Sequence, residues 1–474
     1  MKLTREEIAQ ALDCRVAVAP AQADVVVDGI VWDSRQAAAQ KAFLAIVGER
    51  VDGNGFAAQV IETGCQMIVA TREPDANAVE AAHERDAAIV VVDDYLKAMH
   101  QLASFNRSRL TAAVVGVTGS SGKTTTKNMI ANVCAAQFDT VATAANQNNE
   151  LGVPNTVLTA GPDTQVLVVE MGMRGLGQLE NLCTAVRPTI GVITNIGTAH
   201  EELLGSRDNI ARAKSELVSA LPDGEGTAVL NGDDPFTPDV RKYSRADERG
   251  LKVLLYGRGE GCDVRAVNEE FSDDGMPSFD IVFPDGRTGR VNLPLAGTHN
   301  VMNALAAAAV GYACDMPVEK ICNALGRAKG QAMRQEMVES GGVRIINDAY
   351  NANPDSMKAA LSLLSMMRAD GRKIAVLGDM GELGADENAA HEGTGREAAK
   401  SGIDLLVTVG ELARHIAAGA RAEGMADGAV IECSDATSAL STLEHEVASG
   451  DVVLVKASRF MELERVVEEL VDRC

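Results

Sequence analysis

One short segment restricts the fold more than any other part of the chain. An apolar run at residues 112–117 leads into the turn TGSSGKTT at 118–125, and helix-forming residues follow. Strand, glycine-rich turn and helix form the context that a phosphate-binding loop requires. Gly119 and Gly122 allow backbone amides to turn inward, and the helix N-terminus adds positive potential. The segment therefore predicts an α/β domain with a nucleotide site.

The side chains after the turn suit the same ligand. Lys123 is placed to reach the terminal phosphates of ATP, and the Thr124 hydroxyl is placed to bind magnesium. The strict pattern GxxxxGK[ST] has a glycine where this chain has Val117. A glycine-rich turn that binds nothing is the alternative, but a lysine directly after such a turn has no packing role. We expect the ATP site to include the remaining loop residues Ser120, Ser121 and Thr125.

Chain length and the spacing of apolar runs indicate several domains. A chain of 474 residues exceeds the size at which one hydrophobic core keeps growing. Short apolar runs separated by helical patterns are typical of buried parallel strands. We predict such strands at 89–94 and 227–231, and five more in the last part of the chain at 343–348, 373–379, 404–410, 429–433 and 451–458. We predict an α/β protein with three domains: a substrate-binding module at 1–97, a central parallel-sheet ATP-binding domain at 98–329, and a Rossmann-like doubly wound domain at 330–474.

Composition excludes other classes of protein. The net charge is −23, which argues against a protein that holds nucleic acid over a broad face. The nine cysteines form no CxxC pair, so they predict neither a disulfide framework nor a zinc site. No apolar run is long enough to cross a membrane, and the N-terminal residues are not those of a signal peptide. We expect a cytoplasmic monomer without nucleic-acid partners or membrane insertion.

The loop TGSSGKTT matches the shortened phosphate loop of the Mur ligases and of the related folylpolyglutamate synthases. The similarity extends over nearly the whole chain, which resembles the Mur ligase family and, within it, the MurF type. Such enzymes use ATP to join a carboxylate to an amine. The resemblance implies ATP and magnesium as cofactors. It implies UDP-N-acetylmuramoyl-tripeptide and D-alanyl-D-alanine as small-molecule substrates.

Two further segments resemble the metal-binding parts of the family. Glu170 ends the apolar run in VVEMGM (168–173), and His200 follows another run in TNIGTAHEELLG (194–205). Ligands collect at the carboxyl ends of parallel strands, where a hard cation prefers oxygen ligands. The resemblance implies that both residues bind magnesium. A solvated charge at a strand end and an ordinary loop histidine are the alternatives.

Lys214 aligns with the lysine that carries a carbamate in several of these ligases. A neutral amine and carbon dioxide give a carboxylate on a long arm, but an unperturbed lysine, with a pKa near 10.4, must first lose its proton. An ordinary exposed lysine is the alternative, and the sequence leaves both open.

The remaining nucleotide contacts come from later segments. Asn300 and Asn303 lie three residues apart, hence on one side of a helix, and the resemblance implies that they contact adenine. Asn300 as a helix cap is the alternative. Arg334 lies at a domain junction and Asp348 at a strand end, where family members reach the phosphates and ribose when the last domain closes.

Substrate contacts are implied by three segments. They are QNNELGVPNTVL (147–158), the turn YNANPDS (350–356) and the N-terminal block around DSR (33–35) and 42–59. The candidates are Asn148, Asn149, Tyr350, Asn351, Asn353, Ser34, Arg35 and Arg50. Asn, Pro and Asp also favour turns, so turn chemistry alone could explain the second segment. The N-terminal block departs from the family, with QAAAQKA at 36–42 in place of Pro-Gly-Asp and Asn54 in place of a histidine.

The chemistry implied by the resemblance is activation of a peptide carboxylate as an acyl phosphate, followed by attack of the amine of D-alanyl-D-alanine. A MurE-type ligase and a folylpolyglutamate-synthase-like ligase are the nearest alternatives, although no DNPR-like motif occurs in the last domain. A non-catalytic nucleotide switch would need the loop but not Glu170, His200 and Lys214 together.

Overall fold

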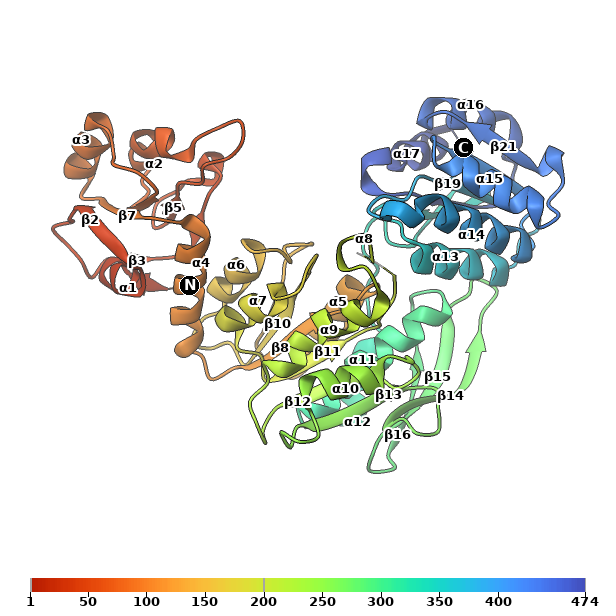
Figure 1. Ribbon diagram of the computed structural model, residues 1–474, viewed down its shortest axis with the longest axis horizontal. Coiled ribbons are helices and arrows are strands. Elements are labelled where there is room, and N and C mark those ends of the chain that lie inside the picture. Colours follow the sequence, from red (N-terminus) through yellow and green to blue (C-terminus); the bar gives the residue numbers. More distant parts are fainter. Residues whose placement is uncertain (1, 199–200, 474) are drawn as a thin grey trace.

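The computed structural model describes residues 2–198 and 201–473, and they form three α/β lobes (Figure 1). The N-terminal and C-terminal lobes stand on either side of a central lobe, with open space between them. No helix in the described ranges is long and apolar enough to cross a bilayer. The α/β class and the three-lobed organisation agree with the sequence prediction, while the exact boundaries at 97 and 329 stay a prediction.

The N-terminal lobe contains a five-stranded sheet with the order β2-β7-β6-β5-β4. Its strands are β2 (Cys14–Val18), β4 (Ile30–Val31), β5 (Ala42–Leu44), β6 (Met67–Ala70) and β7 (Ala88–Val92), and a small sheet pairs β1 (Leu3–Thr4) with β3 (Val26–Val27). Its helices are α1 (Arg5–Ala11), α2 (Ala57–Glu62) and α3 (Ala76–Arg85). The predicted strand at 89–94 ends earlier, because Asp94 caps α4 (Tyr95–Ser108) by accepting a hydrogen bond from the Lys97 amide at 2.7 Å.

The central lobe contains a nine-stranded sheet with the order β16-β15-β14-β13-β12-β11-β8-β10-β9. Strand β8 (Ala113–Thr118), which leads into the glycine-rich loop, lies in its middle between β10 (Val166–Glu170) and β11 (Ile190–Ile193). The other strands are β9 (Thr140–Ala142), β12 (Thr227–Asn231), β13 (Lys252–Gly257), β14 (Val264–Phe271), β15 (Pro277–Val282) and β16 (Thr288–Asn292). The sheet is parallel from β9 to β14, whereas β15 runs antiparallel to both of its neighbours.

Helices cover both faces of this sheet because successive strand residues point in opposite directions. Val114 packs in the layer with α4, α6 (Gly152–Thr159), α7 (Gln178–Val186) and α9 (Arg207–Ser219). Val115 and Val117 pack in the opposite layer with α5 (Lys123–Ala135), α11 (Thr298–Ala313) and α12 (Val318–Leu325). Two short helices, α8 (Glu201–Leu204) and α10 (Thr237–Ser244), complete the lobe.

The C-terminal lobe contains a six-stranded sheet with the order β17-β18-β22-β19-β20-β21. Its strands are β17 (Glu336–Ser340), β18 (Val343–Asp348), β19 (Lys373–Gly378), β20 (Leu405–Val409), β21 (Val430–Cys433) and β22 (Val452–Lys456). Its helices are α13 (Pro354–Met366), α14 (Glu387–Lys400), α15 (Ala413–Ala422), α16 (Ala436–Glu446) and α17 (Glu464–Arg473). The five predicted parallel strands are present, and an antiparallel edge strand, β17, adds to them.

Candidate active site

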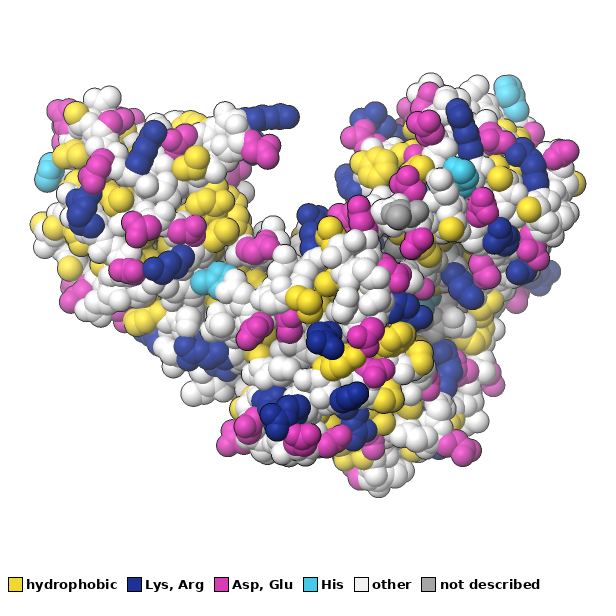
Figure 2. Space-filling view, viewed as in Figure 1, with side chains coloured by type: hydrophobic (Ala, Val, Ile, Leu, Met, Phe, Trp, Pro, Cys, Tyr) yellow, Lys and Arg dark blue, Asp and Glu magenta, His cyan; other side chains and the backbone are white. Residues whose placement is uncertain are grey.

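A cleft of about 1280 Å³ lies at the carboxyl ends of the strands in the central and C-terminal lobes. In the described part of the chain its lining begins at Gly119, so the N-terminal lobe contributes no residue to it. Figure 2 shows the molecule hollowed between the outer lobes, with basic and acidic side chains mixed over this face. This face has no broad basic area of the kind that nucleic acid requires.

The glycine-rich loop lies in the cleft with its lysine folded back on it. Lys123 Nζ donates to the carbonyl of Gly119 at 2.7 Å. Gly122 has φ = 74°, and a Cβ there would lie 2.7 Å from the Asn303 side-chain oxygen, so glycine is required on both counts. All seven predicted loop residues, 119–125, line the cleft.

The side chain of Asn195, which was not among the predicted site residues, accepts hydrogen bonds from two amides of the loop. Asn195 Oδ1 accepts hydrogen bonds from the amides of Ser120 at 3.1 Å and Ser121 at 2.9 Å. Asn195 follows strand β11, the neighbour of β8 in the sheet, and its position at a strand end was the signal available in the sequence.

Glu170 and Thr124 form the part of the site that suits a cation. Glu170 is 1% exposed, and its Oε1 accepts hydrogen bonds from Thr124 Oγ1 at 3.1 Å and Asn148 Nδ2 at 2.8 Å. Its Oε2 is buried without a hydrogen-bond partner among the described residues. A buried carboxylate oxygen without a partner, beside a hydroxyl, fits magnesium, which prefers oxygen ligands and keeps waters or phosphate oxygens. Burial also excludes the solvated strand-end alternative.

No group of three or more His, Cys, Asp or Glu side chains suited to a metal occurs among the described residues. His200, predicted as a second metal ligand, lies outside those residues. Among the described residues, Glu170 and Thr124 are therefore the candidate ligands for a cation.

Lys214 projects into the cleft from helix α9 and is 1% exposed. Burial, together with the nearby charge of Lys123, lowers its pKa well below the usual 10.5. An ordinary exposed lysine is therefore excluded, and a neutral amine is available at moderate pH.

Lys127 is a buried lysine that the sequence analysis did not single out. It lies one helical turn after Lys123, is 3% exposed, and donates from Nζ to the carbonyl of Thr143 at 2.7 Å. Thr143 Oγ1 in turn accepts a hydrogen bond from the amide of Glu170 at 2.9 Å. Lys127 thus connects helix α5 to the strand end that carries the buried carboxylate.

Asn300 and Asn303 lie on one face of α11, as predicted, and both line the cleft. Asn303 Nδ2 donates to Asn300 Oδ1 at 2.9 Å, and Thr126 Oγ1 donates to Asn303 Oδ1 at 3.0 Å. The capping alternative for Asn300 is wrong, because Gly297 is the N-cap. The predicted contact with adenine stays a prediction.

The junction of the two lobes brings Arg334 and Asp348 together with a further lysine. Asp348 accepts a hydrogen bond from Lys456 Nζ at 2.8 Å, and the Arg334 guanidinium lies 4.0 Å from the centre of the Tyr350 ring. Burial raises the pKa of Asp348, and the Lys456 charge opposes that shift. Lys456 is the last residue of strand β22, which pairs with β18. Its position near the end of an apolar run was the signal available in the sequence.

The predicted substrate residues divide into two groups. Tyr350, Asn351, Asn353, Asn148 and Asn149 line the cleft. The Asn353 side chain also accepts a hydrogen bond from the Ser356 amide at 2.8 Å and caps α13, so turn chemistry is present there as well.

The N-terminal candidates Ser34, Arg35 and Arg50 lie apart from the cleft, on the first lobe. Arg35 is exposed and pairs with Asp33 at 2.6 Å. Asn54, where the family has a histidine, donates from Nδ2 to Thr71 Oγ1 at 2.9 Å and so holds its own loop to the sheet.

Comparison with known proteins gives matches along most of the chain. Residues 26–107 match the Mur ligase family, catalytic domain; residues 117–311 match the Mur ligase middle domain; and residues 333–459 match the Mur ligase, glutamate ligase domain. A Bacillus subtilis protein named UDP-N-acetylmuramoyl-tripeptide--D-alanyl-D-alanine ligase is 36% identical over 454 residues, which cover 96% of this chain and 95% of that protein.

Solved structures agree with these matches. The crystal structure of MurF from Acinetobacter baumannii superposes with a TM-score of 0.87 at 33% identity and covers 100% of this chain and 99% of its own. The MurF ligase from Thermotoga maritima, solved in complex with ADP, superposes with a TM-score of 0.80 at 28% identity over 94% of this chain and 99% of its own. This chain belongs to the Mur ligase family.

Proposed function

We propose that this chain joins D-alanyl-D-alanine to UDP-N-acetylmuramoyl-tripeptide with ATP, giving UDP-N-acetylmuramoyl-pentapeptide for peptidoglycan synthesis. The observation that carries the proposal is one cleft in which a phosphate loop with Lys123 faces a second α/β lobe. Support comes from relatives of that name, which match nearly end to end, and from a MurF relative with bound ADP.

The chemistry follows from the difficulty of the reaction. A carboxylate resists attack by an amine because oxide is a poor leaving group, whereas an acyl phosphate releases phosphate readily. The loop amides and Lys123 stabilise the charge on the γ-phosphoryl group during its transfer to the tripeptide carboxylate. Approach of the C-terminal lobe excludes water, which would otherwise hydrolyse the acyl phosphate.

Magnesium belongs to the same proposal, with Glu170 and Thr124 as its described ligands and His200 as a further candidate. When bound, the cation neutralises charge on the phosphate oxygens. On the nucleotide side we propose that Asn300 and Asn303 contact adenine, and that Arg334 and Asp348 contact the phosphates and ribose.

We assign the tripeptide to the cleft near Glu170 and its UDP group to the N-terminal lobe. Asn148 binds Glu170, and Asn149 lines the same cleft, so we assign both to the tripeptide whose carboxylate meets the γ-phosphate. Ser34, Arg35 and Arg50 would contact the UDP group from the N-terminal lobe, with guanidinium groups suited to phosphate. Tyr350, Asn351 and Asn353 are assigned to the incoming amine.

Phosphate release from ATP by the purified protein tests the substrate assignment. UDP-N-acetylmuramoyl-tripeptide is supplied with D-alanyl-D-alanine, with a diamino acid, or without an acceptor. We expect release that depends on the dipeptide and a product with the mass of the pentapeptide. Phosphate release that requires the diamino acid would indicate a MurE-type ligase instead. Phosphate release at the same rate with and without an acceptor would favour a nucleotide switch.

A further inference from the structure

Among the described residues, six carboxylates line the cleft, and four of these have the partners given below. They are Glu150, Glu170, Glu336, Asp348, Asp355 and Glu382. Glu170 binds Thr124 and Asn148, Asp348 binds Lys456, Glu336 accepts from the Met333 amide at 3.0 Å, and Glu382 pairs with Arg174 at 3.2 Å. Glu150 belongs to the central lobe, whereas the residues assigned to the incoming amine belong to the C-terminal lobe. The sixth carboxylate, Asp355, belongs to the C-terminal lobe and accepts a hydrogen bond from a backbone amide of the central lobe.

Asp355 crosses from the C-terminal lobe to the neighbourhood of the phosphate loop. It lies in the first turn of α13, and its Oδ2 accepts a hydrogen bond from the amide of Thr198 at 3.1 Å. The preceding Gly197 has no side chain, and a Cβ there would overlap the carboxylate. The Gly197 amide donates to Ser120 Oγ at 2.9 Å, so one residue separates the Asp355 contact from the loop itself.

The orientation of Asp355 is fixed, yet the group stays accessible. Asn353 and Ser356 form a capping box around it, and Pro354 sets the start of the helix. The side chain is exposed toward the cleft, so a small ligand can reach the carboxylate.

The reaction needs such a group on this side. An α-amino group has a pKa of about 8, so most of the dipeptide is an ammonium ion at pH 7. As the C–N bond forms, positive charge grows on nitrogen, and a carboxylate beside it both stabilises that charge and accepts the proton.

We propose that Asp355 binds the amine of D-alanyl-D-alanine and accepts the proton that nitrogen loses during attack. This inference rests on the proposed function. One ammonium proton passes to solvent and frees the lone pair, which forms the bond to the acyl carbon. The carbonyl electron pair moves to oxygen and returns as the C–O bond to phosphate breaks. The second proton passes to Asp355 and then to the departing phosphate.

The test compares two nucleophiles on Asp355→Asn. The nitrogen of D-alanyl-D-alanine must lose its proton to a base held in the cleft. Hydroxylamine at high concentration traps the acyl phosphate as a hydroxamate without that base, because its weakly basic nitrogen gives up the proton readily and a second hydroxylamine molecule can accept it. We expect kcat for ligation to fall by about 100-fold or more at saturating dipeptide. Hydroxamate formation from ATP and the tripeptide substrate should stay at the wild-type rate, which also shows that the variant is folded.

The matched control is Asp239→Asn. Asp239 is likewise an acidic residue in a first helical turn that contains proline, in α10 and away from the cleft, so it removes a comparable helix-terminal charge. Both reactions should be unchanged in it. An Asp355→Asn protein in which both reactions fall together, or in which ligation is unaffected, would overturn the role of Asp355. A rise in the dipeptide KM alone would overturn its role as the proton acceptor. A wild-type protein that makes neither product would instead contradict the proposed function.

Discussion

Burial gives one lysine of the site a chemistry that surface lysines lack. Lys214 has a pKa well below 10.5, chiefly because it is buried, so its neutral amine can react with carbon dioxide. We predict a carbamate carbon signal in ¹³C NMR of protein incubated with labelled bicarbonate at pH 8. The signal should disappear in Lys214→Met and weaken as falling pH protonates the amine. A wild-type spectrum without the signal would exclude carbamylation.

His299 predicts how stability depends on acid. Its Nδ1 is buried without a hydrogen-bond partner among the described residues, and burial lowers its pKa to about 4. Between pH 6.5 and 4 the unfolded chain binds a proton at this residue and the folded chain does not. The free energy of unfolding therefore decreases as the pH is lowered through this range. The loss reaches about 3 kcal/mol.

Denaturant unfolding at several pH values measures this contribution. A His299→Gln protein should lose less stability than wild type over that range, because its side chain does not titrate. Parallel curves for the two proteins would contradict the assignment. Because the wild-type protein and His299→Gln are compared at each pH, the effects of acid on other residues cancel in the difference between their free energies of unfolding.

Lys123 and Glu170 were predictable from sequence because the residues next to them in the chain determine their position. Lys123 follows two glycines and Glu170 ends an apolar run, and both line the cleft. Asn195 and Asp355 were missed because their contacts join segments more than 70 residues apart. Only the fold brings such segments together.

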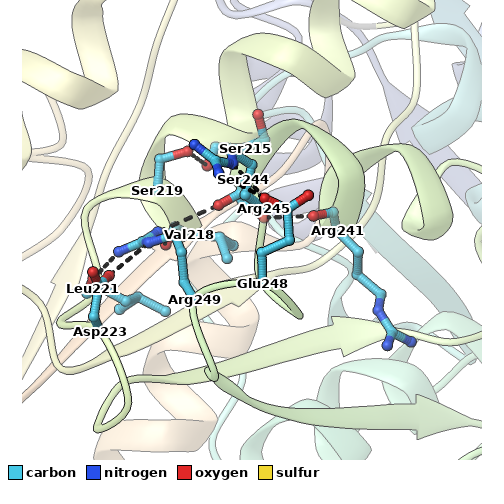
Figure 3. A network of polar contacts seen from close by, with 10 residues as sticks. All are labelled: Ser215, Val218, Ser219, Leu221, Asp223, Arg241, Ser244, Arg245, Glu248 and Arg249. Carbon is cyan, nitrogen blue, oxygen red and sulfur yellow. Dashed lines mark hydrogen bonds and ion pairs between the residues drawn. The ribbon is translucent and has the colours of Figure 1, made fainter.

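At the scale of elements, one arginine joins the ends of two helices (Figure 3). Arg249 Nη1 donates to the carbonyls of Val218 at 3.2 Å, near the end of α9, and of Ser244 at 3.3 Å, at the end of α10. Its other nitrogens bind the carbonyl of Leu221 and the carboxylate of Asp223. Ser244 and Leu221 lie at or just beyond a helix end, where the helix offers no further amide, so Arg249 satisfies their carbonyls. Through Val218 it also holds the end of the helix that carries Lys214.

Arg249→Met should lower the free energy of unfolding by about 2–3 kcal/mol, because it leaves helix-terminal carbonyls unsatisfied. Denaturant titration measures the loss. Arg245→Met is the control in the same network: Arg245 pairs with Glu248 on the surface, where such pairs contribute less than about 1 kcal/mol. Equal losses in the two proteins would show that Arg249 is only another surface charge.

The sequence predicted buried parallel strands well and half-exposed strands poorly. β12 and β18 have the predicted bounds, and all but one residue of each strand is buried. β14, β15 and the edge strand β17 were not predicted, because polar and apolar residues alternate or mix along them and half their side chains face solvent.

At the scale of the whole molecule, the central and C-terminal lobes already touch at several places, including the Arg174–Glu382 pair. Asp274, in the turn before β15, pairs with Arg344 at 2.5 Å, and Asp273 pairs with Arg368 at 3.4 Å. Near the phosphate loop the contact is that of Asp355 with Thr198. The pairs of Asp274 and Asp273 suit a pivot, and the contact of Asp355 suits closure of the C-terminal lobe over the nucleotide. The sequence could imply this domain closure only by resemblance.

The central claim is that this cleft transfers phosphate to a carboxylate before an amine attacks. The most direct measurement uses UDP-N-acetylmuramoyl-tripeptide with ¹⁸O in its terminal carboxylate, together with ATP and D-alanyl-D-alanine. Mass spectrometry should find one ¹⁸O atom in each released phosphate and an equal amount of UDP-N-acetylmuramoyl-pentapeptide. Pentapeptide formed with unlabelled phosphate, or labelled substrate left unchanged while ATP is hydrolysed, would contradict the account.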